Sequence, residues 1–573
     1  MKKVTLILLS LIFALSLFIR FWRLDVYPEA IDEDEMALGY YAYSLIQNGT
    51  DEYGHKFPLY FESAGDYKYG LYSYFDTIPV FLFGLNPVTT RSVSAVAGSL
   101  SVVAIFFLAL EILKKEKYGL LAAFVLALNP THIHFSRVAY NNILGALFAI
   151  VSITLFLRWI KGKGIRSVIF SFLAFVLAIL SYQAYRIFLP VTFILLSAFF
   201  YTDLKVKKIY IAAFSFLAVV VTVLSFIPAA SRARSQNISL LIGQPMIIEQ
   251  IAEDGLAKIP VTITRAFDNK AVNFVLGYAG RYFAYFNPNF LFIASAGGTE
   301  RHTIPNLGLL YLIEAPFLLI GLLYLAKFVP GRRMYIPVLL LLAAPLAAAS
   351  VVESVSTTRA VILVFGYALI TSLGICVLLD SSKKWSKIIL AVILAAYLGN
   401  FAYFFHQYTV HKIYHHPWYS DVGLREMVEN VNRLQGDYDN VVMTGGHYIP
   451  YLFYNKVDPV EFMADSTLND VAQANGVRLK TYNKLVFNMP GCPAAGKRGV
   501  LYVCFGYQVP QAARLVEAIR YRDGQPAIVL VEFVGADTLP EKLPERVEYS
   551  REKDERFPTG ILPDNYETLW PVQ

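Results

Sequence analysis

Eleven apolar runs, each long enough to cross or nearly cross a bilayer, constrain this 573-residue chain more than any other feature. Only 16% of the residues are charged, whereas soluble domains carry about 25%. The sequence therefore predicts a polytopic α-helical membrane protein with about eleven transmembrane helices. The runs lie at roughly 4–22, 92–112, 118–131, 143–160, 167–182, 187–202, 209–228, 304–326, 335–350, 360–379 and 386–405.

Short basic clusters between these runs indicate how the chain is oriented in the membrane. With eleven crossings, all of the clusters fall on one face, which the positive-inside tendency makes cytoplasmic. We therefore expect a cytoplasmic N-terminus. Because the net charge of +7 is confined to such clusters, it does not indicate nucleic-acid binding. The clusters are Lys2 and Lys3, Lys114 to Lys117, Lys161 to Arg166, Lys205 to Lys208, Lys327 to Arg333 and Lys383 to Lys387.

The first outer loop is expected to span residues 23–91. The apolar segment from Leu71 to Leu85 lies inside it and would invert the placement of the basic clusters if it crossed the membrane. We therefore interpret it as a helix along the outer interface. The first apolar run resembles a signal peptide, but its core is too long and no small-residue cleavage site follows, which favours an uncleaved anchor.

The sequence predicts two parts. Residues 1–405 are expected to form the transmembrane module and residues 406–573 a small extracytoplasmic α/β domain. Cys492 and Cys504 fall in the second part, where they either form a disulfide or remain two buried thiols. The expected elements of this domain are a helix at Leu424–Leu434 and strands at Asn440–Thr444, Gly499–Phe505 and Ala527–Phe533.

A cluster of four acids, from Asp32 to Glu35, follows the first apolar run within a few residues. Carboxylates this close repel one another, and beside a bilayer they are poorly solvated. Apolar residues at helical spacing after Asp34 indicate that the acids open an amphipathic helix ending near Asn48 and Gly49. The acids alternatively only cap this helix, but one acid is sufficient for capping. The cluster therefore favours chemistry or cation binding at the membrane surface.

The acidic loop contains few cations. Lys68 lies in "SAGDYKYG", two residues after Asp66, and is a candidate anion ligand. In the alternative reading it only balances the acids. Arg91 begins the next span and either contributes to the same anion site or snorkels to the interface.

Arginines at the outer ends of other spans are further candidates. Arg137 and Asn141 lie in the second outer loop, "NPTHIHFSRVAYNN". An arginine at this position matches a phosphate through two parallel hydrogen bonds. Several outer cations facing an acidic loop predict a polyanion bound beside a general base. Similar positions are occupied by Arg186 in "SYQAYR" and by Glu353 and Arg359 in "VVESVSTTR".

Two groups of histidines have spacings that permit metal binding. His132 and His134 lie two residues apart, but no third ligand is visible near them in the sequence. A second group, His406, His411, His415 and His416, lies where the last apolar run ends. Interfacial histidines are more often hydrogen-bonded structure than metal ligands. We therefore assign no metal-binding residue, and a divalent cation stays open as an alternative.

Taken together, these motifs resemble the GT-C glycosyltransferases. The features are an Asp-Glu pair after the first span, a lysine beside the membrane, an Arg opening the next span, and "SR…NN" in the second outer loop. The sequence is most similar to family 39, which includes protein O-mannosyltransferases and lipid A aminoarabinose transferases. The similarity is concentrated in residues 20–200, through "DEDEMALGYYAYSL" and "GDYKYGLYSY", and continues in "RHTIPNLGLLYL".

The chain also differs from these relatives at two places. Aminoarabinose transferases have an Asp in the second outer loop, where this chain has Asn141 and Asn142. They also have Lys-Pro-Pro where this chain has Lys68-Tyr69-Gly70. Both differences fall at positions that the resemblance connects with phosphate or metal binding.

The resemblance implies a GT-C-like enzyme that moves a sugar from a polyprenyl-phosphate carrier and inverts the anomeric centre. The acceptor is a lipid, protein or glycan hydroxyl, and the site faces the outer side, with a prokaryotic plasma membrane as the expected compartment. Such a displacement requires a base for the acceptor proton. We expect Asp34 to be this base, with Glu35 or Asp32 holding its charge state or the acceptor. The expected phosphate ligands are Lys68, Arg137 and Arg186, supported by Asp66, Asn141, Glu353 and Arg359.

Two other functions are consistent with a membrane protein of this size. One is a transporter or flippase for a lipid-linked glycan, in which the acids would couple protons. Transporters usually carry polar residues within their spans and repeated halves, and neither is clear in this sequence. The other is a non-catalytic scaffold, which the combination of Asp34, Lys68 and Arg137 disfavours.

Overall fold

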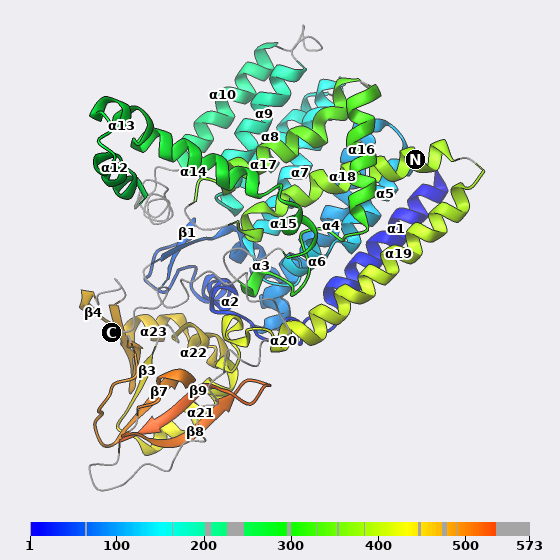
Figure 1. Ribbon diagram of the computed structural model, residues 1–573. Helices are drawn as coiled ribbons and strands as arrows, with labels where there is room; N and C mark the ends of the chain where they lie inside the picture. Colours follow the sequence, from blue (N-terminus) through cyan, green and yellow to red (C-terminus); the bar gives the residue numbers. More distant parts are fainter. Residues whose placement is uncertain are drawn as a thin grey trace.

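A helical bundle and a smaller sheet-containing unit make up the computed structural model (Figure 1). The two units lie at opposite ends of the view, and the first outer loop, with α2 and β1, lies between them. The structure describes residues 2–533 except 64–65, 163, 201–207, 226–245, 295–299, 329–330, 352–354, 383, 445–447, 473–477, 490 and 511.

Every one of the eleven apolar runs forms a helix, which confirms the predicted fold class. Among the residues that the structure describes, six helices are long and apolar enough to cross a membrane, so the predicted number of eleven crossings stays a prediction. The eleven helices are α1 (Lys3–Phe21), α4 (Pro87–Leu113), α5 (Glu116–Leu128), α7 (Asn141–Ile160), α8 (Gly164–Ser181), α9 (Tyr185–Phe199), α10 (Lys208–Ser225), α16 (Glu314–Phe328), α17 (Ile336–Ala348), α18 (Thr357–Ser381) and α19 (Ser386–His406).

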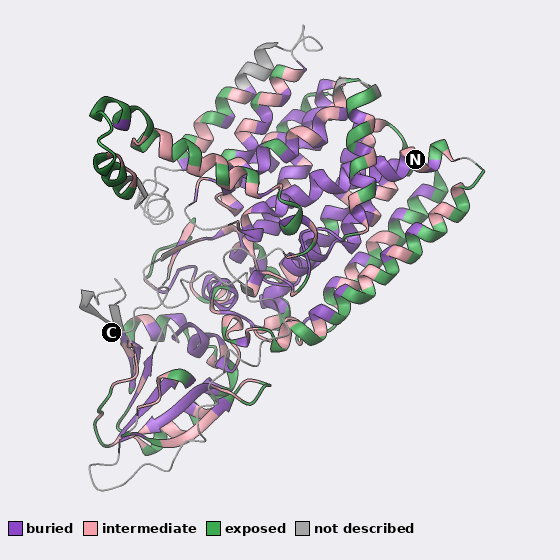
Figure 2. Cartoon of the chain, viewed as in Figure 1, coloured by how far each residue is buried: buried purple, intermediate pink, exposed green. Residues whose placement is uncertain are grey.

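Burial divides the bundle into a core and a periphery (Figure 2). The apolar window of α18 is 89% buried, because α5, α16 and α17 pack around it. By contrast, α1 and α19 are only 22% and 17% buried. They lie side by side along one edge of the bundle and expose apolar side chains, as expected for helices that face lipid.

The first outer loop folds into α2 (Glu33–Gln47), the antiparallel hairpin of β1 (Tyr60–Ser63) and β2 (Asp66–Tyr69), and α3 (Leu71–Phe83). A capping box begins α2: the Asp32 side chain accepts a hydrogen bond from the Glu35 amide, and the Glu35 side chain accepts one from the Asp32 amide. Gly49, with φ of +73°, follows the helix at a position where a left-handed conformation favours glycine. The sequence predicted both ends of α2 correctly.

Short helices make up most of the remaining connections. Between α5 and α7 lies α6 (Pro130–Phe135). The long loop before α16 contains α12 (Met246–Leu256), α13 (Val261–Phe267), α14 (Lys270–Ala284) and α15 (Pro288–Phe292). After α19 the chain continues through a π-helical turn, Gln407–His411, into α20 (Lys412–Tyr414).

The C-terminal unit is a mixed seven-stranded sheet in the order β4-β5-β6-β3-β7-β9-β8. β3 runs parallel to β6 and β7, and the other pairs are antiparallel. This arrangement agrees with the predicted α/β domain, and Cys492 and Cys504 form a disulfide in it. The helices are α21 (Leu424–Leu434), α22 (Tyr448–Asn455) and α23 (Pro459–Asp465). The strands are β3 (Asn440–Thr444), β4 (Ser466–Ala472), β5 (Arg478–Tyr482), β6 (Leu485–Met489), β7 (Val500–Phe505), β8 (Arg514–Arg520) and β9 (Pro526–Glu532).

The hydrophobic core of the C-terminal unit includes residues of the first outer loop. Met36 and Tyr40 of α2 belong to the same buried cluster as Leu452 of α22 and Leu501 of β7. The Tyr40 hydroxyl also donates a hydrogen bond to the Val457 carbonyl over 3.1 Å. The acid-bearing helix therefore forms part of the core on which the sheet packs.

A buried ion pair strengthens this connection. The Tyr448 hydroxyl donates to Glu52 Oε1 over 2.8 Å, and Lys480 Nζ lies 3.7 Å from the same oxygen. The Lys480 ammonium also lies 4.5–4.9 Å from the ring centroids of Tyr53, Tyr448 and Phe462. A lysine this deeply buried stays charged only when other groups replace the water around its ammonium group. Here the Glu52 carboxylate and the aromatic faces do so.

The shared core leads to a prediction about residues 406–573 produced alone. Without α2, the apolar residues that pack against it lose their cover, so we expect secondary structure without fixed tertiary packing. Near-ultraviolet circular dichroism and binding of a hydrophobic dye measure this directly. A sharp near-ultraviolet spectrum and no dye binding would show instead that the unit folds independently.

Candidate functional site

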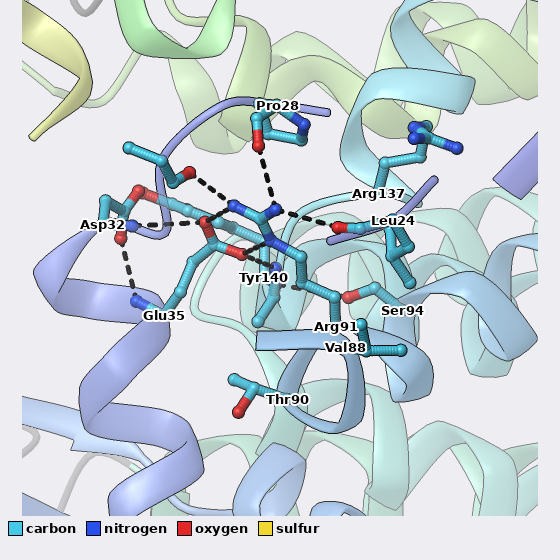
Figure 3. Close-up of polar contacts among 12 residues, drawn as sticks. Leu24, Pro28, Asp32, Glu35, Val88, Thr90, Arg91, Ser94, Arg137 and Tyr140 are labelled. Atoms are coloured by element: carbon cyan, nitrogen blue, oxygen red, sulfur yellow. Dashed lines mark hydrogen bonds and ion pairs between the residues drawn. The ribbon is translucent and has the colours of Figure 1, made fainter. Parts of the chain in front are cut away.

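The carboxylate of Glu35 lies in a buried network centred on Arg91 (Figure 3). Arg91 Nε and Nη2 donate to the two Glu35 oxygens over 2.8 and 2.9 Å, and both side chains are 1% exposed. Arg91 also donates to the carbonyls of Leu24 and Pro28, and the Ala139 amide donates to Glu35 over 2.7 Å. These contacts favour a positioning role for Glu35 over the catalytic role that the sequence predicted.

Asp34 has a different environment from its neighbours. Its side chain is 52% exposed and forms an ion pair with Lys68 Nζ on β2. The first turn of α2 therefore directs one carboxylate into the core and leaves the next one open to solvent. A general base must be accessible to its substrate, and the Asp34 carboxylate meets this requirement. The hairpin places the Lys68 ammonium directly against it.

Arg301, in the segment before α16, contributes a second cation. Its Nη1 lies 3.6 Å from Asp32 Oδ2 and 3.7 Å from Asp421 Oδ2, and its side chain is 31% exposed. Asp421 in turn accepts a hydrogen bond from the Glu33 amide over 3.2 Å. Arg301 is not among the site residues predicted from the sequence. The signal available was its place in the segment "RHTIPNLGLLYL", where an arginine precedes an apolar run.

Burial changes the proton affinity of the acids beside Asp34. It raises the pKa of Asp32 to about 7, and Glu35 adds to this increase while Arg301 opposes it. Burial also raises the pKa of Glu33 to about 8, with repulsion from Asp421 as the next cause. The two carboxyls that precede Asp34 in the chain therefore hold protons wholly or in part near neutral pH, which reduces the repulsion between the acids.

The raised pKa of Glu33 predicts a pH-dependent stability. The folded state binds the Glu33 proton more tightly than the unfolded chain, whose pKa is near 4.5. This contribution to stability is fully present below about pH 4.5 and is lost as the pH rises through about 8. We therefore expect the thermal midpoint of Glu33→Gln to rise relative to that of the native protein between pH 5 and pH 9. A constant difference across this range would contradict the raised pKa.

Arg137 is buried, and backbone carbonyls accept its hydrogen bonds. Its Nη1 donates to the carbonyls of Ile19 and Arg20, and its Nη2 to those of Trp22, Arg23 and Tyr27. No dashed contact joins Arg137 to the network around Glu35 in Figure 3. These contacts hold the end of α1 and the following loop, and the predicted role of Arg137 as a phosphate ligand stays a prediction.

Arg186 and Asn141 lie behind the hairpin that carries Lys68. The Arg186 guanidinium is 4.9 Å from the centroid of the Tyr69 ring and donates to the Tyr60 hydroxyl. Asn141 Nδ2 donates to the Tyr69 carbonyl over 3.3 Å. Both residues therefore contact the strand that positions Lys68. Asn141 was predicted as a supporting residue, whereas the predicted role of Arg186 as a phosphate ligand stays a prediction.

Of the remaining predicted residues, the structure describes the side chain of Arg359 but not those of Glu353 and Asp66. Arg359, at the start of α18, is half-buried and repels a proton on His302, whose Nε2 lies 2.8 Å from the Tyr140 hydroxyl. His302 neighbours Arg301, which brings Arg359 to the same region. Glu353 and the side chain of Asp66 lie outside the described residues.

The histidines have structural neighbours. His132 Nδ1 lies 2.8 Å from Arg20 Nη2, and the buried His134 ring packs edge-on against Tyr408. His406 and His411 contact each other over 3.2 Å. In the part of the chain that the structure describes, no group of three or more His, Cys, Asp or Glu side chains gathers in a way that suits a metal ion.

Comparisons with known proteins agree with the resemblance. Residues 10–240 match the family model of dolichyl-phosphate-mannose-protein mannosyltransferase. The structure is similar to apo ArnT from Cupriavidus metallidurans, with a TM-score of 0.51 and 10% identity over 91% of this chain and 97% of that one. ArnT bound to undecaprenyl phosphate gives a TM-score of 0.50 and 9% identity over 92% and 97% of the two chains.

A third structure is less similar. The Archaeoglobus fulgidus oligosaccharyltransferase in complex with zinc and sulfate aligns with a TM-score of 0.48 and 16% identity, and covers 78% of this chain. This chain spans 61% of that transferase. A search of curated protein sequences finds no significant match. The match over residues 10–240 and the fold that the chain shares with ArnT agree with the expected resemblance to the GT-C glycosyltransferases: the chain has a membrane-spanning helical fold of the GT-C type.

Proposed function

We propose that this protein transfers a sugar from a polyprenyl-phosphate carrier to an acceptor hydroxyl, by inverting displacement with Asp34 as the base. The observation that carries the proposal is the arrangement at the start of α2. Asp34 is half-exposed and paired with Lys68, whereas Asp32 and Glu35 are occupied by the cap and by Arg91. An accessible carboxylate beside cations, in a GT-C fold, is suited to this reaction.

In the proposed reaction, Asp34 accepts the proton of the acceptor hydroxyl while the hydroxyl oxygen attacks the anomeric carbon. The bond between the anomeric carbon and the phosphate oxygen breaks, and the carrier leaves as a polyprenyl phosphate anion. Because the leaving group is a stable anion, no strong acid is needed. Inversion follows because the base and the leaving group lie on opposite faces of the sugar.

Lys68 and Arg301 are the cations best placed to hold the donor phosphate. Lys68 contacts Asp34 directly, and Arg301 approaches Asp32 and Asp421 at distances longer than a tight ion pair. A donor phosphate would replace Asp34 as the partner of Lys68 and leave the Asp34 carboxylate free to accept a proton. Arg186 and Asn141 support the hairpin, and Arg359 adds positive charge. Asp66 and Glu353 stay in the proposed set on sequence grounds.

The names of similar proteins support a lipid-phosphate donor. The matched family uses dolichyl-phosphate-mannose by its description, and ArnT has been crystallised with undecaprenyl phosphate. We propose a hexose or pentose donor of this kind. The acceptor is a hydroxyl of a lipid, a protein or a glycan. The basic clusters support a reaction on the extracytoplasmic face of what we propose is a prokaryotic plasma membrane.

A transfer assay in membranes tests the proposal. Membranes that contain the protein are supplied with radiolabelled polyprenyl-phosphate sugars, and incorporation into lipid, protein and glycan fractions is compared with that in membranes lacking it. Transport of a lipid-linked glycan in proteoliposomes, with no transfer of any sugar, would instead support a flippase.

Lys68→Met provides a sharper form of this test. Removing one preorganised cation from the leaving phosphate is expected to lower kcat/KM by about 100-fold. The matched control is Lys56→Met, because Lys56 is an exposed lysine in the same loop. Equal activity of the two variants would remove Lys68 from the phosphate site.

A further inference from the structure

An apolar groove lies between α1 and α19, outside the site built around Asp34. Its volume is about 560 Å³, within the range of small-molecule sites. The two helices lie along one edge of the bundle (Figure 1). Because they expose apolar side chains there, we expect the groove between them to face lipid. The lining residues are Leu15, Phe18, Ile19 and Trp22 of α1; Phe124, Leu128 and Ile133; Leu394, Leu398, Phe401, Phe404 and Phe405 of α19; and Arg137, Tyr408 and Thr409.

The walls of the groove match the depth of one leaflet. With a rise of about 1.5 Å per residue, the α19 wall from Leu394 to Phe405 is roughly 16 Å long, and the α1 wall from Leu15 to Trp22 is roughly 10 Å long. The hydrocarbon of one leaflet is roughly 15 Å thick, half of the bilayer core. Both walls lie in the halves of α1 and α19 nearer the Asp34 site. The groove therefore has the length of an acyl chain and is shorter than a long polyprenyl chain.

The polar end of the groove carries positive charge. Arg137 is the one charged side chain among the described residues that line it. Arg20 lies beside it, and neither guanidinium pairs with a carboxylate in the described ranges of the chain. Arg137 Nε is buried and has no acceptor there. The exposed Asp25 carboxylate acts on Arg137 only through space. Because the hydrogen-bond partners of both guanidinium groups are carbonyls, hydroxyls and a histidine ring, an anion is favoured at this end.

Aromatic side chains indicate that the Arg137 end of the groove lies at the membrane–water interface. The Trp22 ring packs against Phe405 and Tyr27, with centroids 5.2 and 5.8 Å apart. Tryptophan and tyrosine favour the level of lipid headgroups. The groove thus combines an apolar channel of one-leaflet depth with a cation at headgroup level.

We infer that this groove binds an anionic phospholipid of the leaflet nearer the Asp34 site. One acyl chain lies between α1 and α19, and the phosphate lies near Arg137. This site is separate from the proposed donor site, and the inference does not depend on sugar transfer. The lipid phosphate would neutralise the positive charge of Arg137, the residue whose hydrogen bonds hold the loop that follows α1.

Native mass spectrometry of the full-length protein tests the inference. The protein in detergent is titrated with phosphatidylglycerol and with phosphatidylcholine of the same acyl chains. We expect one phosphatidylglycerol to be retained, with an affinity at least about tenfold above that for phosphatidylcholine. Equal retention of the two lipids would overturn the inference, because it indicates annular lipid only.

Substitutions on α19 locate the binding. Leu398→Trp fills the groove with a bulky side chain, and Val392→Trp is the matched control on the same helix outside the groove. Both native residues are largely exposed, at 67% and 61%, so neither change disrupts the core. We expect Leu398→Trp to weaken phosphatidylglycerol binding at least about tenfold and Val392→Trp to leave it unchanged. Equal binding by both variants would overturn the assignment.

Two further outcomes would identify a different occupant and overturn the inference. If undecaprenyl phosphate displaces phosphatidylglycerol and also loses affinity in Leu398→Trp, the groove holds the chain of a polyprenyl carrier. If Leu398→Trp instead abolishes a dimer and leaves lipid retention unchanged, the groove is an interface between two copies. Arg137→Lys adds a check on charge: it keeps the cation, so preference for phosphatidylglycerol should persist in protein that elutes as folded.

Discussion

Asp34→Asn is expected to lower sugar transfer by about 10²- to 10⁴-fold, the range that a positioned general base contributes. The amide keeps the size of the side chain but does not accept the acceptor proton. Because the Asp34 side chain is half-exposed and the amide keeps its size, we expect the variant to fold normally. Initial rates of transfer from the polyprenyl-phosphate donor, together with elution volume in gel filtration, measure both expectations.

The control for this prediction is Asp25→Asn. Asp25 is an exposed aspartate in the same loop, and we expect its variant to retain activity. The Asp34→Asn variant should also bind the donor at least as well as the native protein, since Lys68 loses its carboxylate partner. Transfer by Asp34→Asn at the native rate would show that another group takes the proton.

Arg91→Met is expected to cause the largest loss of stability, about 3–5 kcal/mol. The substitution leaves the Glu35 carboxylate buried without its cation, and it removes the donors to the carbonyls of Leu24 and Pro28. The loop that precedes α2 then loses its anchor. Unfolding of the purified protein by titration with a denaturing detergent measures the change in the free energy of unfolding.

Two further variants distinguish the loss of stability caused by breaking the buried pair from the loss caused by removing any arginine charge. Arg425→Met breaks an exposed pair with Glu429 and is expected to cost less than about 1 kcal/mol. The double variant Glu35→Met with Arg91→Met removes both buried charges and should be more stable than Arg91→Met alone. If the double variant is less stable than the single one, the hydrogen bonds that Glu35 accepts from the Asp32 and Ala139 amides outweigh the uncompensated charge.

Much of the fold could be predicted from local patterns in the sequence. The apolar runs are sufficient to locate the helices, because a spanning helix must be apolar along its length. The four acids and the following apolar spacing placed α2 and its cap correctly. In the C-terminal unit, Leu424–Leu434 and Asn440–Thr444 have the predicted bounds, because the amphipathic and β-branched patterns there are strong.

The side-chain partners within the site could not be predicted in the same way. Arg137 occurs in a polar outer turn, like a phosphate ligand, but its partners are backbone carbonyls of the α1 terminus, which carry no sequence signal. Arg301 lies far from Asp32 along the chain, and only the packing of the loop before α16 brings them together. Glu35 and Asp34 are adjacent and chemically alike, so their different roles follow from helix geometry.

The joint core of α2 and the C-terminal sheet has a consequence for biosynthesis. The segment with the proposed base leaves the ribosome well before its packing partners in β7 and β9, which come much later in the chain. Until then Met36 and Tyr40 lack their final neighbours. A nascent chain would therefore complete its helices well before the site around the proposed base is fully packed. Quality-control proteases would encounter prematurely terminated chains in which this surface of α2 is exposed.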